Sequence, residues 1–127
     1  MSDNKESIQQ LTDRDAAWRA ELRKAIATPQ RTAIPRARMT ELDPAYRITN
    51  SEEVAQGLTA EQALVEASRC LDCPNPTCVT GCPVNINIPS FIKNIQRGHF
   101  DDAARVLRDT SALPAVCGRV CPQERQC

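Results

Sequence analysis

Residues 69–89 read RCLDCPNPTCVTGCPVNINIP and place four of the chain's seven cysteines within thirteen positions. Their spacing is C-x2-C-x4-C-x3-C, and a proline follows the last of the four. A second group, CGRVCPQERQC at residues 117–127, supplies the other three cysteines, again with a proline after its middle member. The cysteines therefore fall into two loops, and what binds there decides how the chain folds.

A hydrophobic core in this chain would be thin, because only 3% of its 127 residues are aromatic. Small domains with little apolar material usually depend on disulfides or bound metal. The polar start of the chain is not a secretory signal, and no apolar run approaches the roughly 18 residues of a membrane span. We therefore expect a cytoplasmic protein with no membrane partner, where disulfides rarely persist and metal ligation by cysteine is favoured.

The charges point to no particular partner. Formal net charge is zero, so no overall field attracts a nucleic acid or a membrane. Residues 22–40 carry basic side chains and no acid. Such a run can dock an acidic partner, but more often it is a solvated linker, which is what we expect here. Its basic residues are Arg23, Lys24, Arg31, Arg36 and Arg38.

In the first half of the chain, apolar periodicity predicts one amphipathic helix over residues 3–27, capped at its start by Asp3 or Thr12. Three prolines then favour an extended connector over residues 28–50. A short helical turn is expected over residues 51–57, ending near a glycine.

In the second half, Thr59 and Gln62 form a capping box that starts a helix leading into the first cysteine loop. Apolar spacing predicts two helices over residues 88–110 with a break at Gly98. A helical turn carries the last cysteine group. No strand alternation appears, so we expect an all-α fold with two cysteine-rich cluster-binding loops.

Thiolates in short loops suit an iron–sulfur cubane, because each iron takes one sulfur ligand from a different direction. The common bacterial ferredoxin run has spacings of two, two and three, and its last cysteine ligates the other cluster. The middle spacing here is four, but the same crossover is expected. Three cysteines of the first loop then surround one cluster, while Cys82 joins a second cluster with partners from Cys117, Cys121 and Cys127.

Two other uses of these cysteines stay open. Structural zinc usually takes two C-x2-C pairs or cysteine with histidine. Only one such pair exists, and His99 lies between two expected helices, so zinc is the weaker alternative. A redox-active disulfide between Cys70 and Cys73 is weaker still, because no βαβ pattern surrounds the pair.

Residues 38–127 resemble the N-terminal iron–sulfur domain of the glutamate synthase small chain. The resemblance runs from EVAQGLTAEQALVEASRC through ALPAVCGRVCPQERQC and includes every cysteine. Related domains open dihydropyrimidine dehydrogenase and the NADPH-binding subunit of electron-bifurcating transhydrogenases. The resemblance implies an α-helical ferredoxin domain with two 4Fe–4S clusters over residues 38–127, preceded by an N-terminal helix and linker over residues 1–37.

The resemblance also implies a ligand set. Cys70, Cys73 and Cys78 match three ligands of the first cluster, and Cys82, Cys121 and Cys127 match three ligands of the second. Cys117 matches a family position that is commonly not a ligand. In the family, each cluster's fourth ligand lies further downstream, and the chain continues into FAD and NADPH domains with a G-x-G-x-x-G loop. The four glycines here form no such loop, so we expect an excised or truncated domain.

The function implied is electron transfer in an NADPH-dependent oxidoreductase. Electrons would pass from NADPH to FAD in downstream domains, and through the clusters to a large glutamate synthase-type subunit or another redox partner. No residue of this chain is expected to act as a nucleophile or general base, so the domain alone is not expected to be catalytic. Two alternatives are a zinc-binding or docking module for subunit assembly and, with less support, a sensor that uses a labile cluster.

Overall fold

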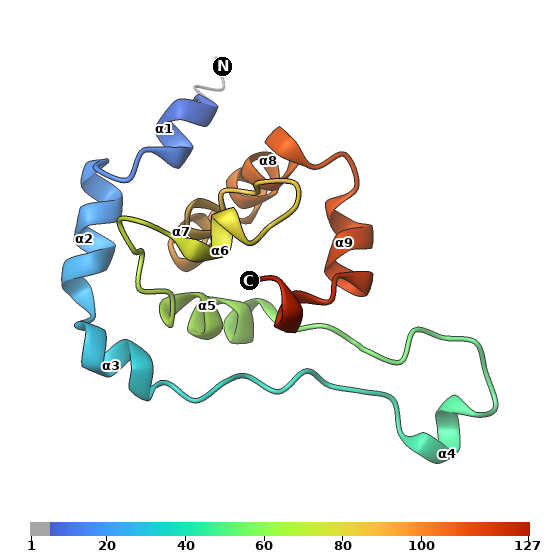
Figure 1. Ribbon diagram of the computed structural model, residues 1–127. Helices are drawn as coiled ribbons and strands as arrows, with labels where there is room; N and C mark the ends of the chain where they lie inside the picture. Colours follow the sequence, from blue (N-terminus) through green and yellow to red (C-terminus); the bar gives the residue numbers. More distant parts are fainter. Residues whose placement is uncertain (1–5) are drawn as a thin grey trace, which may run out of the picture.

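The computed structural model describes residues 6–127, and within them it contains helices but no strand. One isolated antiparallel bridge joins Glu41 and Ala55. The predicted all-α fold is confirmed (Figure 1). The helices are α1 Ile8–Thr12, α2 Ala17–Ala25, α3 Thr28–Ala33, α4 Pro44–Arg47, α5 Ala60–Ser68, α6 Thr77–Thr80, α7 Ile88–Gln96, α8 Phe100–Thr110, α9 Pro114–Val120 and the 3-10 helix η1 Gln123–Arg125.

Helices α5, α7 and α8 form the centre of the fold. Helices α7 and α8 pack against each other as the predicted hairpin, and α5 packs on α7 (Figure 1). Gly98 makes the break between α7 and α8, with a φ of 82° that a side chain would disfavour. Ala103 and Val106 of α8 are buried in the resulting core.

The capping box predicted at the start of α5 is present. The Thr59 hydroxyl accepts a hydrogen bond from the Gln62 N–H at 3.2 Å, and the Gln62 side-chain oxygen accepts one from the Thr59 N–H at 2.9 Å. Both donors would otherwise lack an intrahelical partner. The cap therefore sets where α5 begins and, nine residues later, where the first cysteine loop leaves it.

The single helix predicted over residues 3–27 is wrong, because α1 and α2 are separated by a break at residues 13–16. The Asp13 carboxylate accepts a hydrogen bond from the Asp15 N–H at 2.9 Å, which offers the backbone an alternative to the helix. Ser7 caps α1, whereas Thr12 closes its last turn. Asp3, the other proposed cap, lies outside the described residues.

The connector predicted over residues 28–50 is extended only in part, because α3 and α4 lie within it. Pro29 and Pro44 stand in the first turns of these helices, where a missing N–H costs nothing. Residues 34–58, the arm, project from the helical body and turn back beyond α4 (Figure 1). The helical turn predicted over residues 51–57 is wrong, since this stretch pairs with the outgoing half of the arm through the Glu41–Ala55 bridge.

Charged side chains occupy much of the interior. Arg19, Asp72 and Lys93 are each at most 2% exposed. The expectation of a solvated basic linker is wrong for Arg31, which is buried, and for Arg23, which is half-buried against Asp72. The amphipathic N-terminal segment therefore packs on its own chain, with α1 against α7 and α8 and α2 against α7.

Candidate metal centre

The first cysteine loop turns at a buried aspartate. Asp72 lies between Cys70 and Cys73 and adopts a left-handed backbone with a φ of 54°. Its carboxylate accepts hydrogen bonds from Arg19 Nη2 at 2.6 Å and Nε at 3.0 Å, and from Arg23 Nη1 at 2.8 Å. Such charge-assisted bonds are short and directional. They fix the turn that connects the two cysteines.

Cationic side chains also donate hydrogen bonds to the backbone carbonyl oxygens around Cys70. Lys93 Nζ donates to the Cys70 carbonyl oxygen at 2.8 Å, and Arg31 Nη1 donates to that of Ser68 at 2.7 Å. Burial lowers the pKa of Lys93 to about 8, opposed in part by the neighbouring Cys70 thiolate. Lys93 therefore stays mainly protonated at neutral pH beside a thiol of the first loop.

Opposing effects act on the buried carboxylate. Burial by itself raises the pKa of Asp72, but hydrogen bonds from Arg19 and Arg23, with the charges of Arg19 and Lys93, outweigh it and hold the pKa below its ordinary value. A buried carboxylate keeps its charge when paired and hydrogen-bonded in this way. Asp72 is therefore an anion that neutralises part of the surrounding positive charge.

The second half of the loop lies against the end of the chain. Helix α6 carries Cys78, and the following turn passes through Gly81 to Cys82. A Cβ built on Gly81 would overlap the backbone carbonyl oxygen of Gln126. Glycine therefore permits a close approach of the C-terminal tail, residues 122–127, to this turn. That approach brings Cys127 to the first cysteine loop.

The thiols of the two loops influence one another electrostatically. The pKa of Cys78 is raised by burial, then by the thiolate charges of Cys70 and, more weakly, Cys127. The pKa of Cys121 is raised by desolvation, then by the charges of three other cysteines, in the order Cys127, Cys117 and Cys82. The structure thus brings together thiols of both loops, and Cys127 neighbours both groups.

This arrangement bears on the six predicted ligands without assigning them. Of the trio expected at the second cluster, Cys121 feels the charges of Cys127 and Cys82, and also that of Cys117. Cys117 also makes a 3.9 Å contact with the Ser111 hydroxyl. Cys73 is exposed. The ligand set remains a prediction.

A cavity of about 650 Å³ opens beside Cys70 and Cys78. Its walls are mainly apolar side chains of α5 and α7, with Arg69 at the edge. The Arg69 Nε atom is buried and has no hydrogen-bond partner among residues 6–127, while its Nη1 pairs with Glu66. The apolar residues of α7 in this wall are Ile88, Phe91, Ile92 and Ile95.

These features fit an iron–sulfur cluster. Within the described chain all seven cysteines are free thiols, an all-sulfur donor set of the kind that such clusters take. The cavity supplies apolar cover beside Cys70 and Cys78. In the same part of the chain, no three Cys, His, Asp or Glu side chains converge as ligands of one metal ion.

Sequence reasoning missed the polar side of this site. Residues of α7 with polar side chains, Ser90, Lys93 and Asn94, are completely buried, while its apolar residues face the cavity. The sequence did contain a signal for this buried ion pairing. Asp72 lies between the two cysteines of the C-x2-C pair, and the N-terminal segment contains arginines such as Arg19 and Arg23. His99, which the zinc alternative would use, is exposed and pairs with Asp102 at 3.2 Å.

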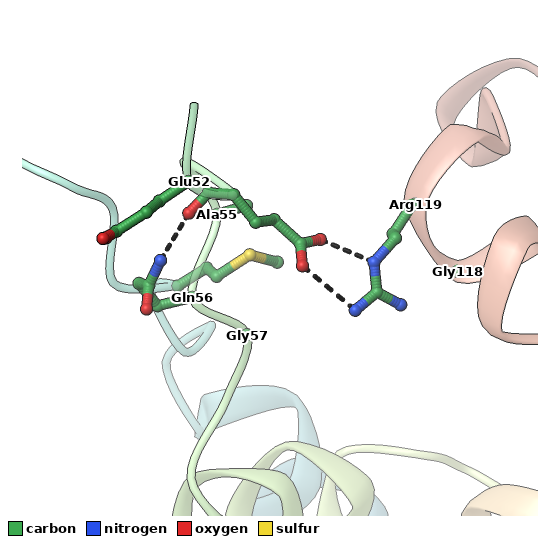
Figure 2. Close-up of a pocket in the computed structure, with 8 residues that line it drawn as sticks. Glu52, Ala55, Gln56, Gly57, Gly118 and Arg119 are labelled. Carbon is green, nitrogen blue, oxygen red and sulfur yellow. Dashed lines mark hydrogen bonds and ion pairs between the residues drawn. The ribbon is translucent and has the colours of Figure 1, made fainter. Parts of the chain in front are cut away.

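The arm is tied to the helix that carries Cys117. Glu53 accepts hydrogen bonds from Arg119 Nε at 2.6 Å and Nη2 at 3.1 Å, across a cavity of about 530 Å³ (Figure 2). Gly118 and Gly57 line opposite sides of this cavity. The pair is exposed, so it contributes little to the position of α9.

The chain is similar to known iron–sulfur proteins. Residues 47–127 match the family model of dihydropyrimidine dehydrogenase domain II, 4Fe–4S cluster. Among residues 6–127, no helix combines the length and apolarity needed to cross a bilayer.

Three curated relatives illustrate the similarity. The NADPH glutamate synthase small chain of Escherichia coli is 44% identical over 75 residues, 59% of this chain and 16% of the relative. That of Azospirillum brasilense is 37% identical over 91 residues, 71% of this chain and 19% of the relative. The NAD-dependent dihydropyrimidine dehydrogenase subunit PreT of Escherichia coli is 41% identical over 76 residues, 60% and 18% respectively.

The chain spans less than a fifth of the length of these relatives. The family model, in contrast, covers residues 47–127, which is well over half of the chain and includes every cysteine. The chain therefore belongs to the family of 4Fe–4S cluster domains found in dihydropyrimidine dehydrogenase.

Proposed function

We propose that this chain is an electron-transfer domain that holds two 4Fe–4S clusters in an oxidoreductase of the glutamate synthase small-chain type. The observation that carries the proposal is the supply of seven free thiols in two loops, with the C-terminal tail packed closely on the turn at Gly81 that leads to Cys82. An all-sulfur donor set divided between two loops suits iron–sulfur clusters.

The residues in the proposed roles are those of the predicted ligand set. Cys70, Cys73 and Cys78 hold the first cluster, and Cys82, Cys121 and Cys127 hold the second. Each cluster, when bound, accepts and releases one electron. The apolar wall from α5 and α7 excludes water on one side. No proton transfer by this chain is needed for that role.

In the proposed whole enzyme, electrons arrive from NADPH through FAD, both bound outside this domain, and leave to a large partner subunit. The names of the relatives, an NADPH-dependent synthase small chain and an NAD-dependent dehydrogenase subunit, support a nicotinamide donor. The domain transfers electrons between the FAD and the partner subunit in such an enzyme. Its own residues, in this proposal, perform no bond-making chemistry.

The test is the content of iron, acid-labile sulfide and zinc per chain, measured on protein purified without oxygen. Two clusters correspond to about eight iron and eight sulfide, with visible absorption that a strong reductant bleaches. About four of each would leave electron transfer in place but overturn the second cluster. Zinc without sulfide would overturn the proposal and favour the structural module.

A pair of variants sharpens the test. Cys121→Ser removes a proposed ligand and is expected to lower the iron content by about half. Cys117→Ala changes a neighbouring thiol of the same group, and its iron content is expected to stay at the wild-type value. Equal losses in the two variants would contradict the proposed ligand set.

A further inference from the structure

Five cationic side chains surround the Cys70–Cys73 loop, and the ligand assignment does not account for them. Four come from residues 8–33, which precede the segment that the family model matches. The fifth comes from α7. Together they form what we call the cationic clamp: Arg14, Arg19, Arg23, Arg31 and Lys93.

Every member of the cationic clamp donates hydrogen bonds to the loop, and Arg31, which reaches the Cys70 carbonyl oxygen at 3.4 Å, also donates to Ser68, two residues before the loop. Arg19 and Arg23 bind the Asp72 carboxylate, and Arg14 donates to the Asp72 carbonyl oxygen at 3.1 Å and 3.3 Å. The Cys70 and Ser68 carbonyl oxygens receive the remaining bonds described above. Because the loop forms no helix or strand of its own, these donors supply the partners that its backbone needs.

The cationic clamp is itself anchored to the body of the fold. Arg19 Nη1 donates to the Ser90 hydroxyl at 2.7 Å and to the Thr12 carbonyl oxygen at 3.1 Å. Asn94 Nδ2 donates to the Leu11 carbonyl oxygen at 3.2 Å. Helices α1, α2 and α7 are thus locked together behind the loop. A loop held from both sides in this way has few conformations to lose when it binds a ligand.

The charge around the loop is strongly unbalanced. The clamp's five cations face one buried acid, Asp72, and Arg14, which is partly exposed, also lies 3.9 Å from the surface acid Asp15, so five cations still outnumber two acids. At Cys121 the acid Glu124 instead adds negative charge. Buried charges interact more strongly than exposed ones, because little water screens them. A nearby positive charge favours the form of a redox centre that has gained an electron.

We propose that the cationic clamp fixes the Cys70–Cys73 loop in its ligating conformation and raises the reduction potential of the cluster held there. The proposal deepens the proposed function and rests on it. Arg19 and Lys93 are positioning and tuning residues in this scheme, since they act through the loop backbone and through their charge.

The electrostatic half is tested by potentiometric titration of the Lys93→Met variant against the Lys24→Met variant. Both changes remove one lysine, but Lys24 is exposed on α2 and makes no contact with the loop. We expect Lys93→Met to lower the midpoint potential of one cluster and leave the other unchanged, with no shift in Lys24→Met. An unchanged midpoint in Lys93→Met would overturn the tuning role.

The positioning half is tested by amide hydrogen exchange on the reduced, metal-free chain. Arg19→Lys keeps the charge but loses the two-pronged bond to Asp72. Exchange of the Cys70 amide, which donates to the Ala67 carbonyl oxygen at 3.2 Å, is expected to accelerate by about tenfold or more, since a charge-assisted hydrogen bond that holds the loop is lost, while exchange in α8 stays at the wild-type rate. Unchanged exchange of the Cys70 amide would overturn the positioning role.

The two measurements separate the inference from the function beneath it. Exchange of the metal-free chain reports on the cationic clamp whether or not clusters bind. If metal analysis fails to find clusters while Arg19→Lys still loosens the loop, the proposed function fails and the positioning role survives. If clusters are present and neither variant has an effect, the inference alone fails.

Discussion

Replacing Asp72 by asparagine isolates the charge at the centre of the interior. Asparagine has nearly the same shape, tolerates the left-handed backbone found here and keeps an acceptor oxygen. The substitution therefore removes the negative charge with little steric change. Arg19, which is 2% exposed, is left in the interior without a counter-ion.

The size of the loss follows from this burial. Opposite charges about 4 Å apart attract by roughly 4 kcal/mol at an effective dielectric constant near 20. The neutral asparagine no longer bears the desolvation cost of a buried carboxylate, which offsets part of the loss. Removal of one partner of a buried pair generally destabilises by about 3–5 kcal/mol, and we expect Asp72→Asn to fall in that range.

Equilibrium urea unfolding of the reduced, metal-free chain, followed by circular dichroism, measures this loss. A decrease of 3 kcal/mol lowers the midpoint by about 1 M or more, given the usual urea dependence of small domains. Since such domains are stable by only about 5–15 kcal/mol, partial unfolding without urea would also agree with the reasoning.

Two comparisons make the experiment decisive. Asp15→Asn changes an aspartate whose side chain is 87% exposed and 3.9 Å from Arg14, so its midpoint is expected to stay close to the wild-type value. Adding Arg19→Met to Asp72→Asn removes the stranded charge, and part of the lost stability should return. A midpoint for Asp72→Asn equal to that of Asp15→Asn would refute the buried-charge account.

Three further predictions concern other parts of the fold. Gly81→Ala should displace the C-terminal tail and lower iron retention against a chelator, with helix content by circular dichroism unchanged; full retention would contradict the close approach. Thr59→Ala should cost about 1 kcal/mol in urea unfolding, as loss of an N-cap does. The same change should raise the pKa of Glu61 in an NMR titration, because that pKa is lowered first by a backbone hydrogen bond and then by one from Thr59. Arg119→Gln should alter stability by less than about 1 kcal/mol, since its partner Glu53 is exposed, and a larger loss would show that the arm is more tightly fastened than its contacts indicate.

Sequence reasoning succeeded where local chemistry decides the structure. The capping box at Thr59 and the break at Gly98 depend on residues a few positions apart, and both are present. It failed to predict the break between α1 and α2, where the Asp13 side chain competes with the helix backbone. It also predicted an extended connector where Pro29 and Pro44 stand in the first turns of α3 and α4. The apolar periodicity of residues 3–27 does not indicate the break at residues 13–16, because the apolar positions keep the same spacing on both sides of it.

The candidate site was likewise predicted from the sequence only in part. Two loops of cysteines with iron–sulfur spacing are visible in the sequence, and the family match agrees with that interpretation. The burial of Lys93 was not predictable from its helix, since apolar residues of α7 line the open cavity and polar ones lie in the interior. Ser90 and Asn94 find their partners in the N-terminal helices, 71 and 83 positions away in the chain, and Lys93 finds its partner at Cys70.

By itself, the sequence determined the helical class, the capping box at Thr59 and the supply of thiols, because propensity, capping and ligand chemistry act over a few residues. Only the tertiary structure decided that four arginines of the N-terminal segment lie on the first cysteine loop and that the C-terminal tail reaches Gly81. Whether a charged side chain is buried or solvated depends on whether another segment supplies an ion-pair or hydrogen-bond partner for it. That partner is chosen by packing between distant segments, which no local pattern records.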